Sequence, residues 1–226
     1  MMRSPQNINV LITGFSVFPG APVNPTAWVV ERLRHENWQP NGARLTARTL
    51  PVRFDLWERE MEPLLDELRP DVVIAFGLSA KATGVTLEST AHNVVATDRP
   101  DFTGACATGA CVVESGRERY ATGLPLREIE MALKTAGIPV SPSDSAGDYL
   151  CNLTFYRLMT LAAKGGPAIA GFIHVPYLDT QVAKLAASGH HVPHASTLTE
   201  RQMMDAVRIT AETCVAAAQR TLRIVA

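Results

Sequence analysis

Asp71-Val72-Val73-Ile74-Ala75-Phe76-Gly77 is the clearest buried strand in this 226-residue chain, and the fold class follows from it. An unbroken apolar run between Pro70 and Gly77 is typical of a parallel strand that is covered on both faces. Strand-like runs also occupy residues 8–14 and 168–175, and segments with helical spacing are found at residues 26–35, 54–68, 126–136, 148–163 and 199–222. Strands that alternate with helices predict an α/β fold. We expect a mainly parallel, mixed and twisted sheet with helices on both faces, an α/β/α sandwich.

The remaining segments add shorter elements to this fold. Strands are expected near residues 44–50 and 139–141, and the region 78–123 should form short strands and a long loop. The pattern Thr197-x-x-Glu200 reads as a capping box, which would start the last helix. No break in composition divides the chain, so residues 1–226 are expected to form a single domain.

Composition and charge argue against several classes of protein. The formal net charge is -1 and no block of Lys or Arg is present, so nothing favours binding to nucleic acid. No apolar run approaches the length of a transmembrane helix, and the first residues lack the apolar stretch of a signal peptide. We therefore expect a cytoplasmic protein with neither nucleic-acid nor membrane partners. The phosphate-binding patterns GxGxxG and GxxxxGK[ST] are both missing from the sequence.

Of the four cysteines, Cys151 has the most suggestive surroundings. The cysteines at positions 106, 111, 151 and 214 show no CxxC spacing, which argues against zinc ribbons and thioredoxin-like sites. Cys151 follows Ser145-Ala146-Gly147 and falls in the first turns of a predicted helix, where the positive end of the helix dipole favours a thiolate. The local sequence alone still favours an inert buried thiol, because a free cysteine behaves as a small hydrophobe.

His174 and Glu88 are candidates for the groups that would assist such a thiol. His174 ends the predicted strand at 168–175, and ligands of open α/β sheets gather beyond the carboxyl ends of strands. The alternative is a core histidine with its hydrogen bonds satisfied. Glu88 lies in the apolar stretch 84–88, where a carboxylate is costly unless it has a partner such as an imidazole. Spacing alone favours an exposed glutamate on an edge strand.

The cluster His190-His191-x-x-His194 superficially resembles a metal site. Pro193 interrupts it and no cysteine or carboxylate completes the ligand set, so a solvated loop is the better interpretation. We expect no metal.

Taken together and in this order, the motifs resemble those of the pyroglutamyl-peptidase I (pyrrolidone-carboxylate peptidase) family of cysteine peptidases. The resemblance runs from about Val10 to the final helix. Its segments are Leu11-Ile12-Thr13-Gly14-Phe15-x-x-Phe18-x-Gly20 with Asn24-Pro25, Leu50-Pro51-Val52, Pro70-Asp71 before Gly77-Leu78, Glu88 with Asn93, Ser145-Ala146-Gly147-x-Tyr149-Leu150-Cys151-Asn152 with Phe155-Tyr156, and Gly171-Phe172-Ile173-His174-Val175-Pro176-Tyr177.

The resemblance implies an exopeptidase that removes N-terminal pyroglutamate from small peptides. It implies that Cys151 attacks the pyroglutamyl carbonyl, that His174 transfers the proton, and that Glu88 orients the imidazole. It further implies that Phe15 and Phe18 line the lactam pocket, that the protein is a homotetramer, and that no cofactor is used. Expected contributors to substrate binding are, in full, Phe15, Phe18, Leu78, Asn93 and Arg99.

The sequence departs from the family pattern between Glu88 and Gly123. Ser89 stands where family members carry Arg, and in Thr97-Asp98-Arg99-Pro100-Asp101 the family's loop Arg is displaced by one position. If the segment is extended, this shift places Asp98 beside the thiol and predicts a weak or unusually selective peptidase. A shift of the loop that brings Arg99 to the same place is the alternative. An amidase of different specificity and a catalytically silent binding protein also remain open.

Overall fold

The computed structural model describes residues 8–18 and 21–225 and is built around a six-stranded sheet in the order β2-β1-β3-β8-β4-β7. Neighbouring strands are parallel except β4 and β8, which are antiparallel. This confirms the predicted mainly parallel, mixed sheet. The strands of this sheet are β1 (Ile8–Phe15), β2 (Ala43–Leu50), β3 (Val72–Leu78), β4 (Val85–Glu88), β7 (Val140–Ser143) and β8 (Ile169–Val175).

Two further strand pairs and the helices complete the fold. The pairs are β5 (Thr90–His92) with β6 (Arg119–Ala121) and β9 (Tyr177–Leu178) with β10 (Thr197–Leu198). The helices are α1 (Pro25–Glu36), α2 (Glu62–Leu68), α3 (Leu126–Thr135), α4 (Leu150–Ala162), α5 (Asp179–Ala187) and α6 (Glu200–Val225).

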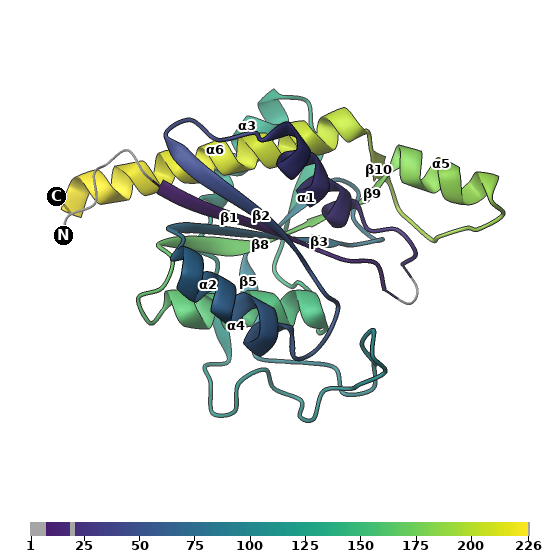
Figure 1. Ribbon diagram of the computed structural model, residues 1–226, viewed down its shortest axis with the longest axis horizontal. Helices are drawn as coiled ribbons and strands as arrows, with labels where there is room; N and C mark the ends of the chain where they lie inside the picture. Colours follow the sequence, from purple (N-terminus) through teal and green to yellow (C-terminus); the bar gives the residue numbers. More distant parts are fainter. Residues whose placement is uncertain (1–7, 19–20, 226) are drawn as a thin grey trace.

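Helices cover both faces of the sheet, as predicted. Helices α1, α3 and α6 pack on one face, and α2 and α4 pack on the other (Figure 1). The alternation of side chains along β1 explains this division. Val10 and Ile12 join the core under α1 and α6, whereas Leu11 and Phe15 join the core under α2 and α4. Both cores are apolar, so the central strands have no wet face, in agreement with their unbroken apolar runs.

Two local expectations need correction. The predicted helix 54–68 begins instead with a π-helical turn, Trp57–Met61, before α2. The capping box of α6 is formed by Thr199 and Gln202, not by Thr197 and Glu200. The Thr199 hydroxyl accepts from the Gln202 N–H at 3.1 Å, and the Gln202 side chain accepts from the Thr199 N–H at 3.1 Å. Thr197 is instead part of β10, where it pairs with Tyr177.

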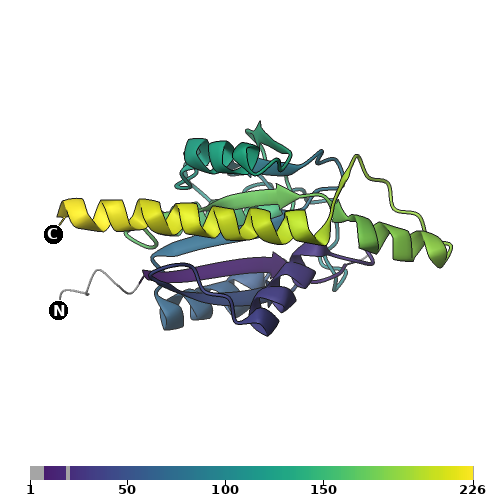
Figure 2. The same ribbon diagram turned by 90° about the horizontal axis from the view of Figure 1, so that it is seen from above.

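Helix α5 is an element that the sequence reading did not predict. It extends beyond the sheet, at the end opposite the two chain termini (Figures 1 and 2). None of its residues is buried, and its apolar residues Val182 and Leu185 are only partly covered.

Candidate active site

β1, β3 and β8 are parallel neighbours, so their carboxyl ends lie at the same end of the sheet. The start of α4 lies beside them, because a Cβ on Gly77, near the end of β3, would be 3.0 Å from Sγ of Cys151. In β8, Ala170 and Phe172 face the core under α4, so His174 faces the same side. Thr86 of β4 lies opposite His174, and Glu88 is therefore its diagonal neighbour on that face. The sheet register alone thus brings the histidine and the carboxylate together.

Glu88 and His174 form a buried hydrogen-bonded pair. The Nδ1–H of His174 donates to Oε1 of Glu88 at 2.7 Å, and the two residues are only 7 % and 1 % exposed, respectively. Glu88 lies on an interior strand, so its interpretation as an exposed edge residue is wrong. Its second oxygen, Oε2, is buried without a hydrogen-bond partner among the described residues. The imidazole is therefore the main partner of this carboxylate, and its second ring nitrogen is left for the thiol.

The pKa of His174 is strongly raised by its neighbours. Burial by itself would lower the pKa, but the charge and hydrogen bond of Cys151, followed by those of Glu88, outweigh it and raise the pKa to about 9. The imidazole is therefore protonated at neutral pH. A buried cation is stable here because an acidic group lies on each side of it.

Cys151 is the second residue of α4, and its thiol is half-buried. Tyr149, which precedes the helix, supplies no side-chain cap. The backbone N–H groups of Leu150 and Cys151 have no hydrogen-bond acceptor among the described residues. They thus form a small positive site at the helix start, which suits a thiolate or an oxyanion. By contrast, Cys214 lies on α6 with its side chain buried in the core, and burial raises the pKa of its thiol.

Gly77 makes room for the thiol, a role that sequence reasoning did not assign. Its neighbour across the β3–β8 ladder is His174. A Cβ at position 77 would lie 3.0 Å from Sγ of Cys151 and 2.6 Å from Cζ of Phe172. A residue larger than glycine would therefore displace the sulfur or the ring. The signal in the sequence was a glycine that ends the most apolar strand.

We predict that Gly77→Ala lowers kcat/KM for a cleaved substrate by about 100-fold, because small displacements of reacting groups have effects of that size. Gly109→Ala is the matched control, since its Cβ would meet no atom within 4 Å. Steady-state kinetics of both variants, with their melting temperatures, would check this. Equal activity of the two variants would show that the extra methyl group does not displace the sulfur of Cys151.

A cavity of about 570 Å³ opens over Cys151, His174 and Glu88. Four of the five residues expected to bind substrate line it, namely Phe15, Phe18, Leu78 and Arg99. Other lining residues come from the β3–β4 connection, β7 and the turn before α4: Lys81, Ala82, Thr83, Ser141, Ser143, Ser145, Ala146, Gly147, Asp148 and Tyr149. The structure thus gathers these side chains, from distant parts of the chain, around one cavity.

Asn93 is the expected binding residue that does not line this cavity. Its side-chain amide donates to the carbonyl of Val113 at 2.8 Å and accepts from the N–H of Val113 at 2.9 Å. Both ends of the amide are occupied, so Asn93 fastens the long loop rather than facing a ligand.

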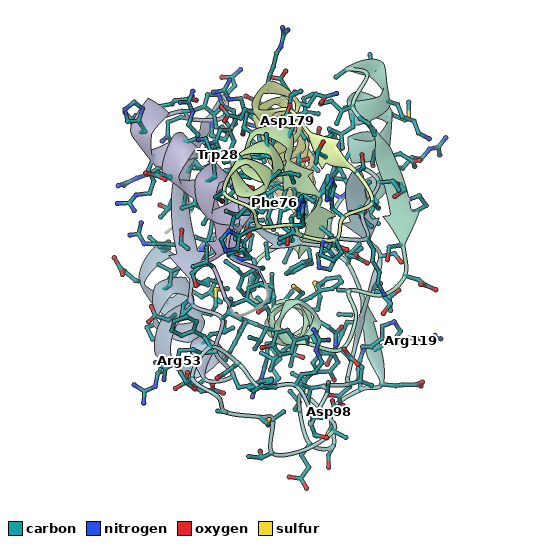
Figure 3. The ribbon with its side chains drawn as sticks, turned by 90° about the vertical axis from the view of Figure 1, so that its right-hand side faces the viewer. Trp28, Arg53, Phe76, Asp98, Arg119 and Asp179 are labelled. Atoms are coloured by element: carbon teal, nitrogen blue, oxygen red, sulfur yellow. The ribbon has the colours of Figure 1, made fainter. Side chains whose placement is uncertain are left out.

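The placement of Asp98 beside the thiol is also wrong. Arg99, not Asp98, lines the cavity, and Figure 3 shows Asp98 at the lower edge of the molecule. The guanidinium of Arg99 binds Asp148 at 3.0 Å and lies 4.4 Å from the centroid of the Tyr149 ring. The Tyr149 hydroxyl donates to the carbonyl of Pro100 at 2.8 Å, which helps to fix the register of this loop. The expectation of weak activity therefore loses its geometric basis.

Asn152 is a further residue whose role the sequence did not reveal. It is fully buried next to Cys151, and its side chain makes three hydrogen bonds to the backbone of His92 and Val94, at 2.8 to 3.0 Å. These bonds tie the start of α4 to the segment that follows β5. The only available signal was a polar residue in the first turn of a mainly apolar helix.

Neither a metal cluster nor a membrane-spanning helix is found in the described part of the chain. Within residues 8–18 and 21–225, no three His, Cys, Asp or Glu side chains are grouped to hold a metal ion. Among the helices of that same part, none is long and apolar enough to cross a membrane.

Known proteins are similar to this chain in sequence and in fold. A family model described as pyroglutamyl peptidase matches residues 8–217. The pyrrolidone-carboxylate peptidase of Pyrococcus furiosus is 32% identical over 206 residues, covering 91% of this chain and 97% of its own. Pyrrolidone-carboxylate peptidase 1 of Ralstonia nicotianae is 37% identical over 205 residues, covering 90% and 91%.

Solved structures agree with the sequence comparisons. A mutant pyrrolidone carboxyl peptidase from Pyrococcus furiosus superposes with a TM-score of 0.84 at 31% identity, covering 93% of this chain and 99% of its own. Pyroglutamyl peptidase I from Bacillus amyloliquefaciens gives 0.81 at 30% identity, covering 93% and 98%. The fold and the site together define an α/β protein in which a thiol, an imidazole and a carboxylate lie together at one end of the central strands. The chain belongs to the pyroglutamyl peptidase family of cysteine peptidases.

Proposed function

We propose that this protein removes N-terminal pyroglutamate from peptides, with Cys151 as nucleophile, His174 as proton carrier and Glu88 as the group that orients the imidazole. The observation that supports it most is the cavity in which a half-buried thiol, a protonated imidazole and a buried carboxylate meet. The family relatives, which carry the names pyrrolidone-carboxylate peptidase and pyroglutamyl peptidase, support the choice of substrate.

In this mechanism the thiolate of Cys151 attacks the carbonyl carbon that joins pyroglutamate to the next residue. A carbon–sulfur bond forms, and the carbonyl oxygen becomes an oxyanion. The free N–H groups at the start of α4 would stabilise that charge. As the carbon–nitrogen bond breaks, the imidazolium of His174 gives its proton to the leaving amine. Water then attacks the thioester carbon while His174 accepts a proton from it. The carbon–sulfur bond breaks, which restores the thiolate of Cys151 and releases free pyroglutamate.

The lactam would lie against the aromatic side of the cavity. Phe15 is the last residue of β1 and lines the cavity, as do Phe18 and Val52. Pyroglutamate carries no charge, so an apolar wall with few hydrogen bonds suits it. The catalytically silent alternative is not favoured, because all three chemical groups are in place and the relatives bear the names of peptidases.

The raised pKa of His174 predicts the alkaline limit of activity. The imidazolium is needed to protonate the leaving amine, and it is lost as pH rises through about 9. We therefore expect kcat/KM to be flat near neutral pH and to fall about tenfold per pH unit above about 9. The raised pKa also stabilises the fold, fully below pH 6.5 and no longer above about 9.

Glu88→Gln would move this limit, because the charge of Glu88 is one cause of the raised pKa. The alkaline limb of kcat/KM should shift to lower pH in the variant. Measurement of kcat/KM against pH for both proteins, with a substrate whose leaving group does not titrate in this range, would check the prediction. An unchanged limb would assign that ionisation to another group.

The proposed function is tested by the release of a fluorescent amine from pyroglutamyl aminocoumarin. The matched substrate is prolyl aminocoumarin, which lacks the lactam carbonyl and carries a charged amine instead. We expect hydrolysis of the first and not of the second. Hydrolysis of neither, or of both at similar rates, would refute the assigned specificity.

We further propose that the protein assembles as a homotetramer, as its family resemblance implies. Helix α5 supports this proposal, since it extends beyond the sheet with no residue buried while Val182 and Leu185 remain partly exposed. Multi-angle light scattering would measure the mass in solution, and a monomeric mass would refute the proposal.

The cytoplasm is the compartment that we propose. A nucleophilic thiol works only when it is reduced, and all four cysteines are free. Cell fractionation would test this, and recovery from an oxidising extracellular compartment would contradict it.

A further inference from the structure

The two sides of the cavity differ in chemistry. In the strand order β2-β1-β3-β8-β4-β7, His174 of β8 and Leu78 of β3 lie in the middle. Phe15 lies on the β1 side of this pair. Thr86 of β4 and Ser141 of β7 lie on the opposite side. The side of the cavity near β1 is therefore aromatic, and the side near β4 and β7 is lined by hydroxyl groups.

The direction of a bound peptide follows from this asymmetry. If the lactam lies on the aromatic side, as proposed above, the leaving amine and the residue that carries it extend toward β4 and β7. That residue then meets the connection between β3 and β4, which contributes Lys81, Ala82 and Thr83 to the wall of the cavity. Two residues of extended peptide span at most about 7 Å, so the residue after pyroglutamate stays inside the cavity mouth.

Backbone hydrogen bonds anchor the turn that carries Lys81 to the strand end of the catalytic histidine. The N–H of Ser79 donates to the carbonyl of Val175, the residue after His174, at 3.0 Å. The N–H of Ala82 donates to the carbonyl of Ser79 at 3.0 Å and closes a turn around Lys81. The carbonyl of Ala80 accepts from the N–H of Ala195 at 2.8 Å. The lysine therefore projects from a fixed turn and not from a free loop.

The charges around the cavity leave Lys81 without a partner. Glu88 is bound to His174, and Arg99 is bound to Asp148. Lys81 is exposed, lines the cavity and forms no ion pair or hydrogen bond with any described residue. The ammonium group of Lys81 is therefore free to bind an anionic group of the substrate on the side of the cavity where the leaving amine lies.

We propose that Lys81 is a specificity-determining residue that favours a carboxylate on the residue directly after pyroglutamate. The carboxylate has two possible sources. It is the C-terminal carboxylate of a pyroglutamyl dipeptide, or the side chain of an acidic residue in a longer peptide. The proposal rests on the proposed function, because it assigns the leaving-group side of the same site.

Two pairs of substrates separate these sources. Pyroglutamyl-alanine is compared with pyroglutamyl-alanine amide, and pyroglutamyl-glutamate amide is compared with pyroglutamyl-glutamine amide. Within each pair only the carboxylate changes. We expect the ratio of kcat/KM, carboxylate over neutral, to fall about fivefold from the natural protein to Lys81→Met in at least one pair, the size expected for an accessible ion pair. The pair that responds identifies the source.

Two further variants sharpen the experiment. Lys81→Glu should lower the same ratio more than Lys81→Met does, because repulsion replaces attraction. Lys184→Met is the matched control, since Lys184 is also exposed but lies on α5 and does not line the cavity. It should keep the ratio of the natural protein. Raising NaCl from about 0.05 to about 0.5 M should reduce the ratio of the natural protein, because salt screens exposed charges.

Equal ratios in the natural protein and in both Lys81 variants, for both substrate pairs, would overturn the proposal. Failure of the proposed function would look different. In that case the natural protein would not hydrolyse the two neutral substrates, pyroglutamyl-alanine amide and pyroglutamyl-glutamine amide, at all.

Discussion

Cys151→Ala is expected to lower kcat/KM for a pyroglutamyl amide by about 10⁴-fold or more. Loss of the nucleophile from a covalent mechanism removes the acyl-enzyme route altogether, and what remains is binding and oxyanion stabilisation. The thiol lies beside His174 at the start of α4, which has no side-chain cap, and it lines the cavity. The fold should be little affected, because alanine is a good helix former and the side chain is only half-buried.

Cys106→Ser and Cys111→Ser are the controls for this variant, because both cysteines are exposed and neither lines the cavity over His174. Each should retain most of the activity. Cys214 is unsuitable as a control, since it lies on α6 with its side chain buried in the core. If Cys151→Ala kept substantial activity while Cys106→Ser or Cys111→Ser lost it, the nucleophile would have to be reassigned.

His174→Ala should cause a loss of about 10³-fold or more, because one group both pairs with the thiolate and protonates the leaving amine. Glu88→Gln should cost less, about 10²-fold, since glutamine keeps the shape of the side chain and loses the charge that stabilises the imidazolium. Steady-state kinetics at a pH near neutral would measure both. The order of the two losses is the informative result.

His35→Ala serves as the histidine control, because His35 is exposed near the end of α1, outside the cavity lining. It should have natural activity. Glu88→Gln should also lose activity through kcat more than through KM, because Glu88 stabilises a charge and is not expected to touch the lactam. A loss in Glu88→Gln that exceeds the loss in His174→Ala would contradict the assigned roles.

Much of this fold could be predicted because its signals are local. The apolar runs at β1, β3 and β8 reveal strands that are covered on both faces, and the periodicity of Leu126–Thr135 reveals α3. Helix α5 was missed because its nine residues are too few to show a helical repeat clearly. The capping box of α6 was misplaced by two residues, since Thr197 and Thr199 offer equally good capping patterns and only the pairing of Thr197 with Tyr177 separates them.

The residues of the candidate site also differ in whether a local signal in the sequence indicates them. His174 and Cys151 became candidates because a strand end and a helix start can be predicted from the sequence, and the family resemblance then implied their roles. Asp98 was misplaced because the register of an irregular loop depends on distant contacts, here those of Arg99 with Asp148 and Tyr149. Gly77 and Asn152 act through close approach and through backbone hydrogen bonds, which spacing along the chain does not reveal.

The most direct test of the central claim is a substrate-shaped affinity label, the chloromethyl ketone of pyroglutamate. It carries the lactam into the cavity and alkylates a nucleophile at the position of the scissile carbonyl. Peptide mapping by mass spectrometry should find one label per chain, on Cys151, and the loss of activity should match the labelled fraction. Free pyroglutamate should slow the reaction, whereas proline should not. Labelling of Cys106 or Cys111 with activity retained, or labelling of Cys151 that pyroglutamate does not slow, would contradict the account.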